Sequence, residues 1–365
     1  MKPDILTETN IDSLRAEIDT IDEQLLNLMS RRLTAARKIG TIKSRNNARI
    51  LDAGREKTIF QRLTSLNRGP LTTTAMHHIF SEIIAASREI QGPVSIAYLG
   101  PEGTFTHMAA IQQFGHLARL TPFFNISDVF QEIDKGNYHY GVVPVENSIE
   151  GAVNHTLDLF LETHVSICAE IYMNIAHDLL SVSDDLSEIR VIHSHPQAFA
   201  QCRKWMRTHL PHAVFEACSS TAVAAQKARD HSDAAAIASR DAAHIYQLKT
   251  VASRIEDSAC NTTRFLVIGQ DSPAPSENDK TSLMFATSHT PGSLYQALKP
   301  LNDAAINMVK LESRPARYAN WSYIFFTDIE GHIQDSGIQK AVSKMKPLCM
   351  FIKCLGSYPR AETVF

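Results

Sequence analysis

Three cationic side chains in the first 45 residues, Arg15, Arg32 and Lys43, could bind a small anion. Arg32 falls between Leu28 and Ala35 at a position where a heptad pattern requires an apolar side chain. A charge at such a position either needs a buried anionic partner or extends its long side chain past the seam to solvent. This position alone favours neither interpretation.

The spacing of these cations limits which of them can share a site. Arg15 and Lys43 lie four heptads apart, so they share a face of one helix. At about 1.5 Å per residue, Lys43 is roughly 16 Å and Arg15 roughly 25 Å from Arg32 along the helix. Long side chains from Arg32 and Lys43 can therefore meet on one molecule. If Arg15 serves the same site, it must come from a second, antiparallel chain.

Two shorter helical patterns carry further polar sets. The pattern over about residues 50 to 67 puts Asp52, Arg55 and Glu56 on one face, and the pattern over about 72 to 91 does the same for Ser87 and Gln91. Each set taken alone is more often a solvated helix face than a site.

The middle of the chain places polar clusters after short apolar runs. They contain Glu146, Asn147 and Ser148, then Ser194, His195 and Gln197, then Ser220 and Thr221, and finally Thr263, Arg264 and Phe265. Strands that alternate with helices predict an α/β sheet, in which ligands bind at strand ends. Taken singly, these residues are more often helix caps or a buried core histidine.

Residues 282 to 358 follow the order βαββαβ, which predicts a ferredoxin-like fold. Two motifs stand out there. They are Gly292, Ser293 and Leu294 after a proline, and Glu312, Ser313, Arg314 and Pro315 at the end of a strand. A turn and a helix cap would explain each motif by itself.

The elements that must position these residues form three segments. Residues 1–92 are basic, poor in glycine and aromatic residues, and carry one heptad seam at Ile11, Leu14, Ile18, Ile21, Leu25, Leu28, Ala35, Ile39 and Ile42. Residues 93–270 form the predicted α/β domain, 271–280 a polar, proline-rich linker, and 281–365 the C-terminal domain.

Composition excludes several classes of function. The 365 residues carry a net charge of −3 and a pI near 6.6, which argues against a nucleic-acid partner. We find neither a signal peptide nor an apolar run of membrane-spanning length, so we expect a cytoplasmic protein with no membrane partner. The six cysteines are scattered and the histidines are dispersed, so we expect reduced thiols and no metal site.

Residues 8 to 91 resemble the all-helical chorismate mutase family, through LRAEIDTID, RR, IGTIK, ILDAGRE and SREIQ. The resemblance implies an intertwined dimer whose site borrows one arginine. The substrate-binding residues it implies are Arg15, Arg32, Lys43, Asp52, Glu56, Ser87 and Gln91, with Arg55 as a further cation.

The rearrangement of chorismate to prephenate needs no cofactor or nucleophile, only a bound compact conformer and donors to the breaking ether oxygen. In this interpretation Arg15 and Arg32 hold the carboxylates, and Lys43 and Gln91 donate to the ether oxygen. Asp52 and Glu56 hold backbone amides or the ring hydroxyl. Because a glutamine donates at any pH, Gln91 predicts no requirement for an acidic optimum.

The segment from Val94 to Gln270 resembles the prephenate dehydratase family, through GPEGTF, VENSIEG, SHPQAFAQC, SSTAVAA and the tripeptide TRF. The resemblance implies two α/β lobes around a cleft, like those of periplasmic binding proteins. We assign Thr263 to the leaving hydroxyl and Arg264 to a substrate carboxylate, and expect the other polar clusters to line the cleft. The proton donor stays open among Glu146, His195 and water.

The two C-terminal motifs resemble those of the ACT domain, which implies that L-phenylalanine binds between two such domains as a feedback inhibitor. Together the three resemblances predict a bifunctional chorismate mutase/prephenate dehydratase that forms a homodimer or a larger oligomer. One alternative is a monofunctional dehydratase whose helices are a dimerisation arm. The other is an amino-acid sensor without catalytic activity.

Overall fold

The computed structural model describes residues 11–46, 50–270, 272–315 and 323–361. Three helices come first: α1 (Ile11–Arg45), α2 (Ala53–Leu66) and α3 (Thr73–Gln91). Side chains define two of the starts, because Asp52 accepts a hydrogen bond from the backbone N–H of Arg55 and Thr72 accepts one from that of Ala75. The predicted three-helix segment is confirmed.

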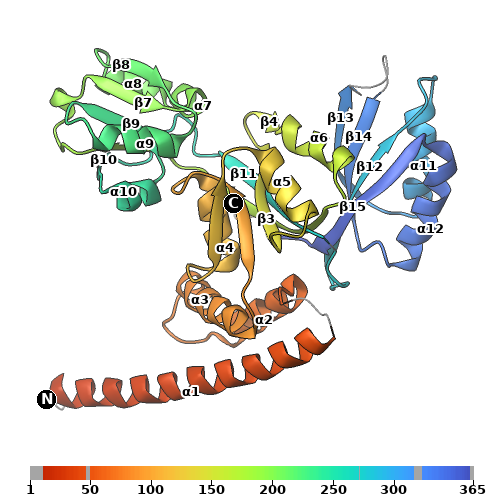
Figure 1. Ribbon diagram of the computed structural model, residues 1–365, viewed down its shortest axis with the longest axis horizontal. Coiled ribbons are helices and arrows are strands. Elements are labelled where there is room, and N and C mark those ends of the chain that lie inside the picture. The colour runs from red at the N-terminus through yellow and green to blue at the C-terminus, as the bar shows by residue number, and fades with distance from the viewer. Residues whose placement is uncertain (1–10, 47–49, 271, 316–322, 362–365) are drawn as a thin grey trace, which may run out of the picture.

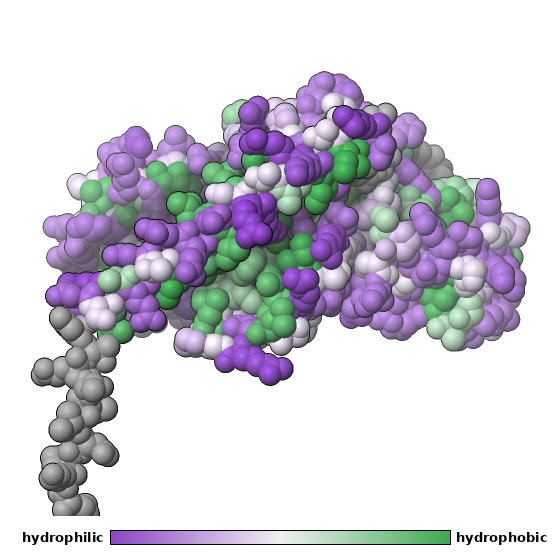
Figure 2. Space-filling view, turned by 90° about the horizontal axis from the view of Figure 1, so that it is seen from below, coloured by the Kyte–Doolittle hydropathy of each residue, from purple (hydrophilic) through white to green (hydrophobic). Residues whose placement is uncertain are grey.

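Helix α1 runs its full length without a break, and its N-terminal half extends away from the rest of the chain (Figure 1). The apolar seam is exposed there, at Ile11, Leu14, Ile18, Ile21, Leu25 and Leu28. Viewed from the side of α1, apolar side chains lie along and beside the helix (Figure 2). Only the C-terminal part of α1 is packed within the chain, where Ala36 and Gly40 are buried.

The first lobe of the α/β segment is built on the strand order β2-β1-β3-β11-β5, with β4 paired to β3. Its strands are β1 (Ser95–Leu99), β2 (Arg119–Phe123), β3 (Tyr140–Asn147), β4 (Gly151–Ala152), β5 (Ser166–Asn174) and β11 (Thr262–Gly269). Its helices are α4 (Phe105–Phe114), α5 (Ile126–Asp134) and α6 (Asn154–Glu162). Strand β11 lies antiparallel between β3 and β5, although it is far from both in sequence.

The second lobe has the strand order β10-β6-β9-β7-β8. Its strands are β6 (Asp178–Ser181), β7 (Val191–Ser194), β8 (Val214–Ala217), β9 (Ala234–Ala238) and β10 (Lys249–Ala252). Its helices are η1 (Leu186–Glu188), α7 (Pro196–Gln201), α8 (Arg203–His209), α9 (Thr221–Arg229) and α10 (Arg240–Tyr246). The chain enters this lobe after β5 and returns to the first lobe in β11, so the predicted two-lobed α/β fold is confirmed (Figure 1).

The C-terminal segment forms an antiparallel sheet in the order β13-β14-β12-β15. Its elements are β12 (Asp279–Ala286), α11 (Ser293–Asp303), β13 (Met308–Pro315), β14 (Tyr323–Glu330), α12 (Ser336–Met345), η2 (Lys346–Leu348) and β15 (Phe351–Pro359). This is the predicted βαββαβ order. Strand β12 begins at Asp279, so the last two residues of the predicted linker belong to the sheet.

The C-terminal sheet packs against the first lobe through a shared apolar core. Met284, Phe326 and Leu355 from this sheet join Ile167 and Leu266 from the first lobe in one buried cluster. The opposite face of the C-terminal sheet packs on α11 and α12. Within the described residues, no helix is both long and apolar enough to cross a membrane.

Gly40 makes the crossing of α1 and α3 possible. A Cβ atom at this position would lie 2.6 Å from the Cα and 2.8 Å from the carbonyl oxygen of Gln91. Both obstructing atoms belong to the backbone, so the helices would have to separate to admit a side chain.

We therefore expect Gly40→Ala to lower the free energy of unfolding by about 1–3 kcal/mol through overpacking. The control is Gly54→Ala in α2, where the nearest atom would be at 3.4 Å; alanine should be neutral or favourable there. Urea unfolding followed by circular dichroism measures both. Equal stability of the two variants would show that the helices do not cross as closely as described.

Candidate functional sites

Arg32 reaches across from α1 to α3. Its guanidinium donates to the carbonyl oxygen of Ile83 at 3.2 Å and to the hydroxyl of Ser87, and Ser87 itself donates to the same carbonyl at 2.7 Å. Burial lowers the pKa of Arg32. The guanidinium is thus neither extended into solvent nor ion-paired with any acidic residue that the structure describes, and an anion could bind there.

Gln91 and Lys43 are two further hydrogen-bond donors of the predicted set. The Gln91 side-chain amide donates to the carbonyl of Ser87 at 2.9 Å, while its buried Oε1 has no hydrogen-bond partner among the described residues. The Lys43 ammonium donates to the carbonyl of Ile50 at 2.9 Å. Gln91 lies where α1 and α3 cross, against Gly40, and Lys43 is three residues further along α1.

Glu56 on α2 contributes a buried carboxylate to the same region. Burial raises the pKa of Glu56, Arg88 and Lys43 oppose this shift, and Asp52 adds to it. Arg88 on α3 forms an ion pair with Glu56 at 3.3 Å. Sequence reasoning missed Arg88, although its place beside Ser87 on the same helix could have drawn attention to it.

The other predicted residues of the helical set are exposed in the single chain. Arg15 is exposed and pairs with Asp12 at 3.5 Å on the free half of α1. Asp52 caps α2, and Asp52 and Arg55 are both exposed. Within one chain the described contacts join Arg32, Ser87 and Gln91, and separately place Glu56 near Lys43 and Arg88, while Arg15 lies away on the free half of α1.

A chain of hydrogen bonds joins the two α/β lobes at Thr263. The side-chain amide of Asn147 donates to the Thr263 hydroxyl at 2.9 Å and to Asn261 Oδ1 at 2.7 Å. Asn261 in turn donates to Gln201 at the end of α7, at 2.8 Å. Sequence reasoning did not single out Asn261 or Gln201, although Asn261 stands two residues before Thr263.

The predicted residues of the second lobe lie at helix starts. His195 caps α7 by accepting from the backbone N–H of Gln197, and Ser220 caps α9 by accepting from that of Val223. The Ser194 hydroxyl donates to the His195 carbonyl at 3.0 Å, and Thr221 is buried in the first turn of α9. Burial lowers the pKa of His195, against the opposing charge of Glu150.

Ser148 and Phe265 have structural contacts. The Ser148 hydroxyl donates to the carbonyl of Cys260 at 3.2 Å and accepts from the backbone N–H of Thr262 at 2.9 Å. Phe265 is buried in an apolar core of the first lobe. The prediction that Phe265 lines the cleft is therefore not supported by its position.

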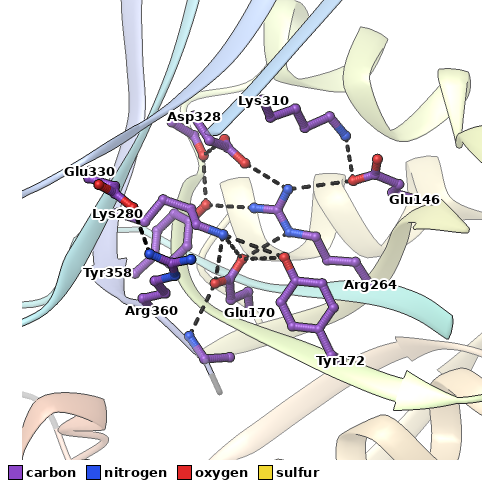
Figure 3. A network of polar contacts seen from close by, with 12 residues as sticks. Glu146, Glu170, Tyr172, Arg264, Lys280, Lys310, Asp328, Glu330, Tyr358 and Arg360 are labelled. Carbon is purple, nitrogen blue, oxygen red and sulfur yellow. Dashed lines mark hydrogen bonds and ion pairs between the residues drawn. The ribbon is translucent and has the colours of Figure 1, made fainter. Parts of the chain in front are cut away.

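Arg264 points away from Thr263, because neighbouring residues of a strand face opposite sides of a sheet. Its guanidinium lies between the first lobe and the C-terminal sheet (Figure 3). It bonds Glu170 at 2.9 Å and the Tyr358 hydroxyl at 2.9 Å, and pairs with Asp328 at 2.7 Å. The chain's own carboxylates thus occupy the arginine that we predicted to bind a substrate carboxylate.

Every strand of the C-terminal sheet contributes to this buried cluster. Lys280 of β12 bonds both carboxylate oxygens of Glu170, at 2.8 and 2.9 Å. Lys310 of β13 bonds Glu146 of β3 at 2.6 Å, while Asp328 comes from β14 and Tyr358 from β15 (Figure 3). Glu146 therefore faces the C-terminal sheet and is not beside Thr263 as a proton donor.

The two C-terminal motifs lie apart within one chain. Ser293 and Leu294 line a hollow of about 330 Å³ together with Thr287, Ser288, His289, Thr290, Pro291, Tyr323 and Phe325. The turn before it depends on Gly292, whose φ is +80°. Arg314 instead pairs with Asp158 of α6 at 3.0 Å. None of the residues Glu312, Ser313, Arg314 and Pro315 lines the hollow in this chain.

We looked for a metal site among the residues that the structure describes. His, Cys, Asp and Glu side chains there form no group of three that could hold a metal ion.

Comparison with known proteins gives two family matches. Residues 14–92 match the model of chorismate mutase type II, and residues 96–273 match that of prephenate dehydratase. The bifunctional chorismate mutase/prephenate dehydratase of Aquifex aeolicus is 44% identical over 355 residues, which cover 96% of this chain and 98% of the relative. The protein of that name from Pseudomonas aeruginosa is 39% identical over 360 residues, with 97% and 99% covered.

A solved structure resembles a large part of this chain. The prephenate dehydratase from Arthrobacter aurescens, in complex with L-Phe, superposes with a TM-score of 0.68 at 32% identity. The match covers 73% of this chain and 90% of that structure.

The cluster around Arg264 generates a stability prediction. Burial raises the pKa of Asp328, but Arg264, a hydrogen bond from Ser282 and nearby lysines outweigh this effect, so its net pKa is lowered. Asp328→Asn should therefore cost about 3–5 kcal/mol of stability, because it leaves buried positive charge without its partner.

The matched control is Glu330→Gln on the same strand, where the carboxylate pairs with Arg360 at a partly exposed site. That change should cost less than about 1 kcal/mol. Urea unfolding compares the two variants. If Asp328→Asn were as stable as Glu330→Gln, the cluster around Arg264 would not contribute the expected free energy of unfolding.

Proposed function

Because the chain belongs to the bifunctional chorismate mutase/prephenate dehydratase family, we propose that it converts chorismate to prephenate and prephenate to phenylpyruvate. The observation that carries the proposal is the cation Arg32, which reaches Ser87 on the facing helix and has no acidic partner among the described residues. In our proposal Arg32, Lys43, Glu56, Ser87 and Gln91 form one helical pocket. We further propose that residues 1–92, 93–270 and 281–365 are separate domains, and that the enzyme works in the cytoplasm without a cofactor.

The mutase step requires binding and electrostatic stabilisation only. Arg32 offers two parallel donors to one carboxylate of chorismate, and no carboxylate of the described chain competes for them. Lys43 and Gln91 donate to the ether oxygen as its bond breaks. The NH₂ group of Gln91 uses one hydrogen on the Ser87 carbonyl, so its second hydrogen can be donated to the substrate.

A second chain completes this pocket in our proposal. The exposed seam on the free half of α1 would be buried against the same seam of a partner. An antiparallel partner would bring its Arg15 to the second carboxylate, which Arg15 of the same chain cannot reach on one straight helix. A homodimer follows from both observations, and pairing of dimers into a larger oligomer is compatible with it.

The dehydratase step takes place at Thr263, between the lobes. Its hydroxyl binds the departing hydroxyl of prephenate, while Asn147 orients Thr263 through the 2.9 Å hydrogen bond. A threonine is too weak an acid to transfer a full proton unaided, and Glu146 is committed to Lys310. Arg264 contributes by fixing the strand, because its own guanidinium is engaged elsewhere.

We propose that L-phenylalanine is the feedback inhibitor. The hollow beside Ser293 and Leu294 is of a size that suits one amino acid. The related structure from Arthrobacter aurescens holds L-Phe. In our proposal a second subunit supplies the motif from Glu312 to Pro315, which lies away from this hollow in one chain.

A coupled assay tests the function directly. Chorismate should yield phenylpyruvate, and L-phenylalanine should suppress its formation. Prephenate turnover without chorismate turnover would favour the monofunctional dehydratase with a helical arm. Absence of both reactions would favour a sensor without catalytic activity.

Thr263→Ala should lower dehydratase turnover by about 10²- to 10⁴-fold, because the departing hydroxyl loses its hydrogen-bond partner. Mutase activity should not change, since Thr263 lies outside the helical pocket. Thr262→Ala, one residue earlier on β11, is the control and should keep both activities. Phenylpyruvate formation from prephenate measures the effect, and an unchanged rate in Thr263→Ala would remove this residue from the site.

Mixing Arg15→Ala subunits with Arg32→Ala subunits tests the shared pocket. Each variant alone should be inactive as a mutase, whereas a mixed dimer has one site with both lesions and one with neither. Random pairing of equal amounts should restore about a quarter of wild-type mutase activity. Arg37→Ala, an exposed arginine on the same helix, should remain active in either mixture. If mixing restores no activity, the site is not shared.

A further inference from the structure

Arg88 stands between the helical pocket and the α/β segment. It lies on α3, and its side chain is 9% exposed. One nitrogen, Nη1, pairs with the Glu56 carboxylate at 3.3 Å, and the other, Nη2, donates to the carbonyl of Gln113 at 2.9 Å. The guanidinium also lies over the ring of Phe114, 5.5 Å from its centre. One side chain therefore connects a pocket residue to helix α4.

The contact with Glu56 is an ion pair, and Nη1 makes no hydrogen bond in the described structure. The position of the guanidinium is therefore set by its other contacts, which come from α4. Helices α3 and α4 are held closely there, since a Cβ on Gly115 would lie 2.3 Å from the Cβ of Ala85. His116 pairs with Glu82 at 2.7 Å across the same contact.

Three charged groups act on the Glu56 carboxylate. They are Lys43 on α1, Asp52 at the N-cap of α2, and Arg88 on α3. Burial and Asp52 raise the pKa of Glu56, while Arg88 and Lys43 lower it, and Arg88 is the larger of these two influences. Without Arg88, only Lys43 would oppose the other two effects.

We propose that Arg88 is a positioning residue of the mutase pocket, which keeps the Glu56 carboxylate charged and in place while helix α4 holds Arg88. The proposal rests on the mutase activity proposed above and on the expectation from the sequence that Glu56 helps to hold the ring hydroxyl of the substrate. It makes the mutase pocket depend on the α/β segment that carries the second activity. Arg88 itself need not touch the substrate.

The test is the pH dependence of mutase kcat/KM in Arg88→Met. Loss of the cation raises the pKa of Glu56, so a smaller fraction is ionised at acidic and neutral pH. The acid limb of the plot of kcat/KM against pH should move up by roughly one pH unit. At a pH below this limb, kcat/KM should fall about tenfold, and it should recover at higher pH. Arg62→Met, an exposed arginine on α2, should keep the wild-type profile.

Two further variants separate positioning from simple structural support. Arg88→Lys keeps a charge but cannot hold Glu56 and Gln113 together, so its acid limb should move in the same direction by less. Phe114→Leu removes the ring beneath the guanidinium and should also move the limb upward. Turnover of prephenate by each variant reports whether the α/β segment is intact.

Uniform loss of mutase activity at every pH, with the acid limb unmoved in Arg88→Met and Arg88→Lys, would overturn the proposal. Absence of mutase activity in the wild type would instead overturn the proposed function. In that case ¹³C NMR titration of the Glu56 carboxyl, identified with Glu56→Gln, still tests Arg88. An equal pKa in wild type and Arg88→Lys would then refute the positioning role.

Discussion

The arrangement of the α/β and C-terminal segments depends on the buried charge of Arg264. Removing a guanidinium from water is costly unless carboxylates and hydrogen bonds replace the solvent. Glu170 from the first lobe and Asp328 from the C-terminal sheet provide that replacement, and Tyr358 completes it. Because these partners come from both sides, neither sheet can satisfy Arg264 alone. The strand that presents Thr263 between the lobes is thereby fixed from behind by the C-terminal sheet.

Strand β13 extends this dependence toward the proposed effector site. Its residues alternate between exposed and partly buried, and Lys310, Glu312 and Arg314 share the partly buried side. Two of these bind carboxylates of the first lobe, namely Glu146 and Asp158. Glu146 directly precedes Asn147, whose side chain bonds Thr263, so a shift of β13 would alter an ion pair next to this hydrogen bond.

Local patterns predicted the elements well, because heptads, caps and strand alternation depend on neighbours in sequence. The distance argument for Arg15 also needed only the helix rise, and α1 is continuous as it required. Tertiary partners could not be predicted in this way. Lys280 looked like part of a polar linker because its partner, Glu170, is 110 residues away. Arg88 was missed for a similar reason, since its importance comes from Glu56 and from the approach of α4.

Arg32 and Arg264, two of the three arginines that we assigned to substrate carboxylates, differ in the partners that the fold supplies to each. Among the described residues, Arg32 has a hydroxyl and a carbonyl as its acceptors and no acidic partner, and burial lowers its pKa. Burial also opposes the charge of Arg264, but Tyr358, Asp328 and Glu170 outweigh it and raise the pKa. An arriving carboxylate would relieve an unfavourable state at Arg32, whereas at Arg264 it would have to displace carboxylates already bound. Both positions carry an arginine. The carboxylates that the fold places beside each one determine which arginine can still bind a substrate carboxylate.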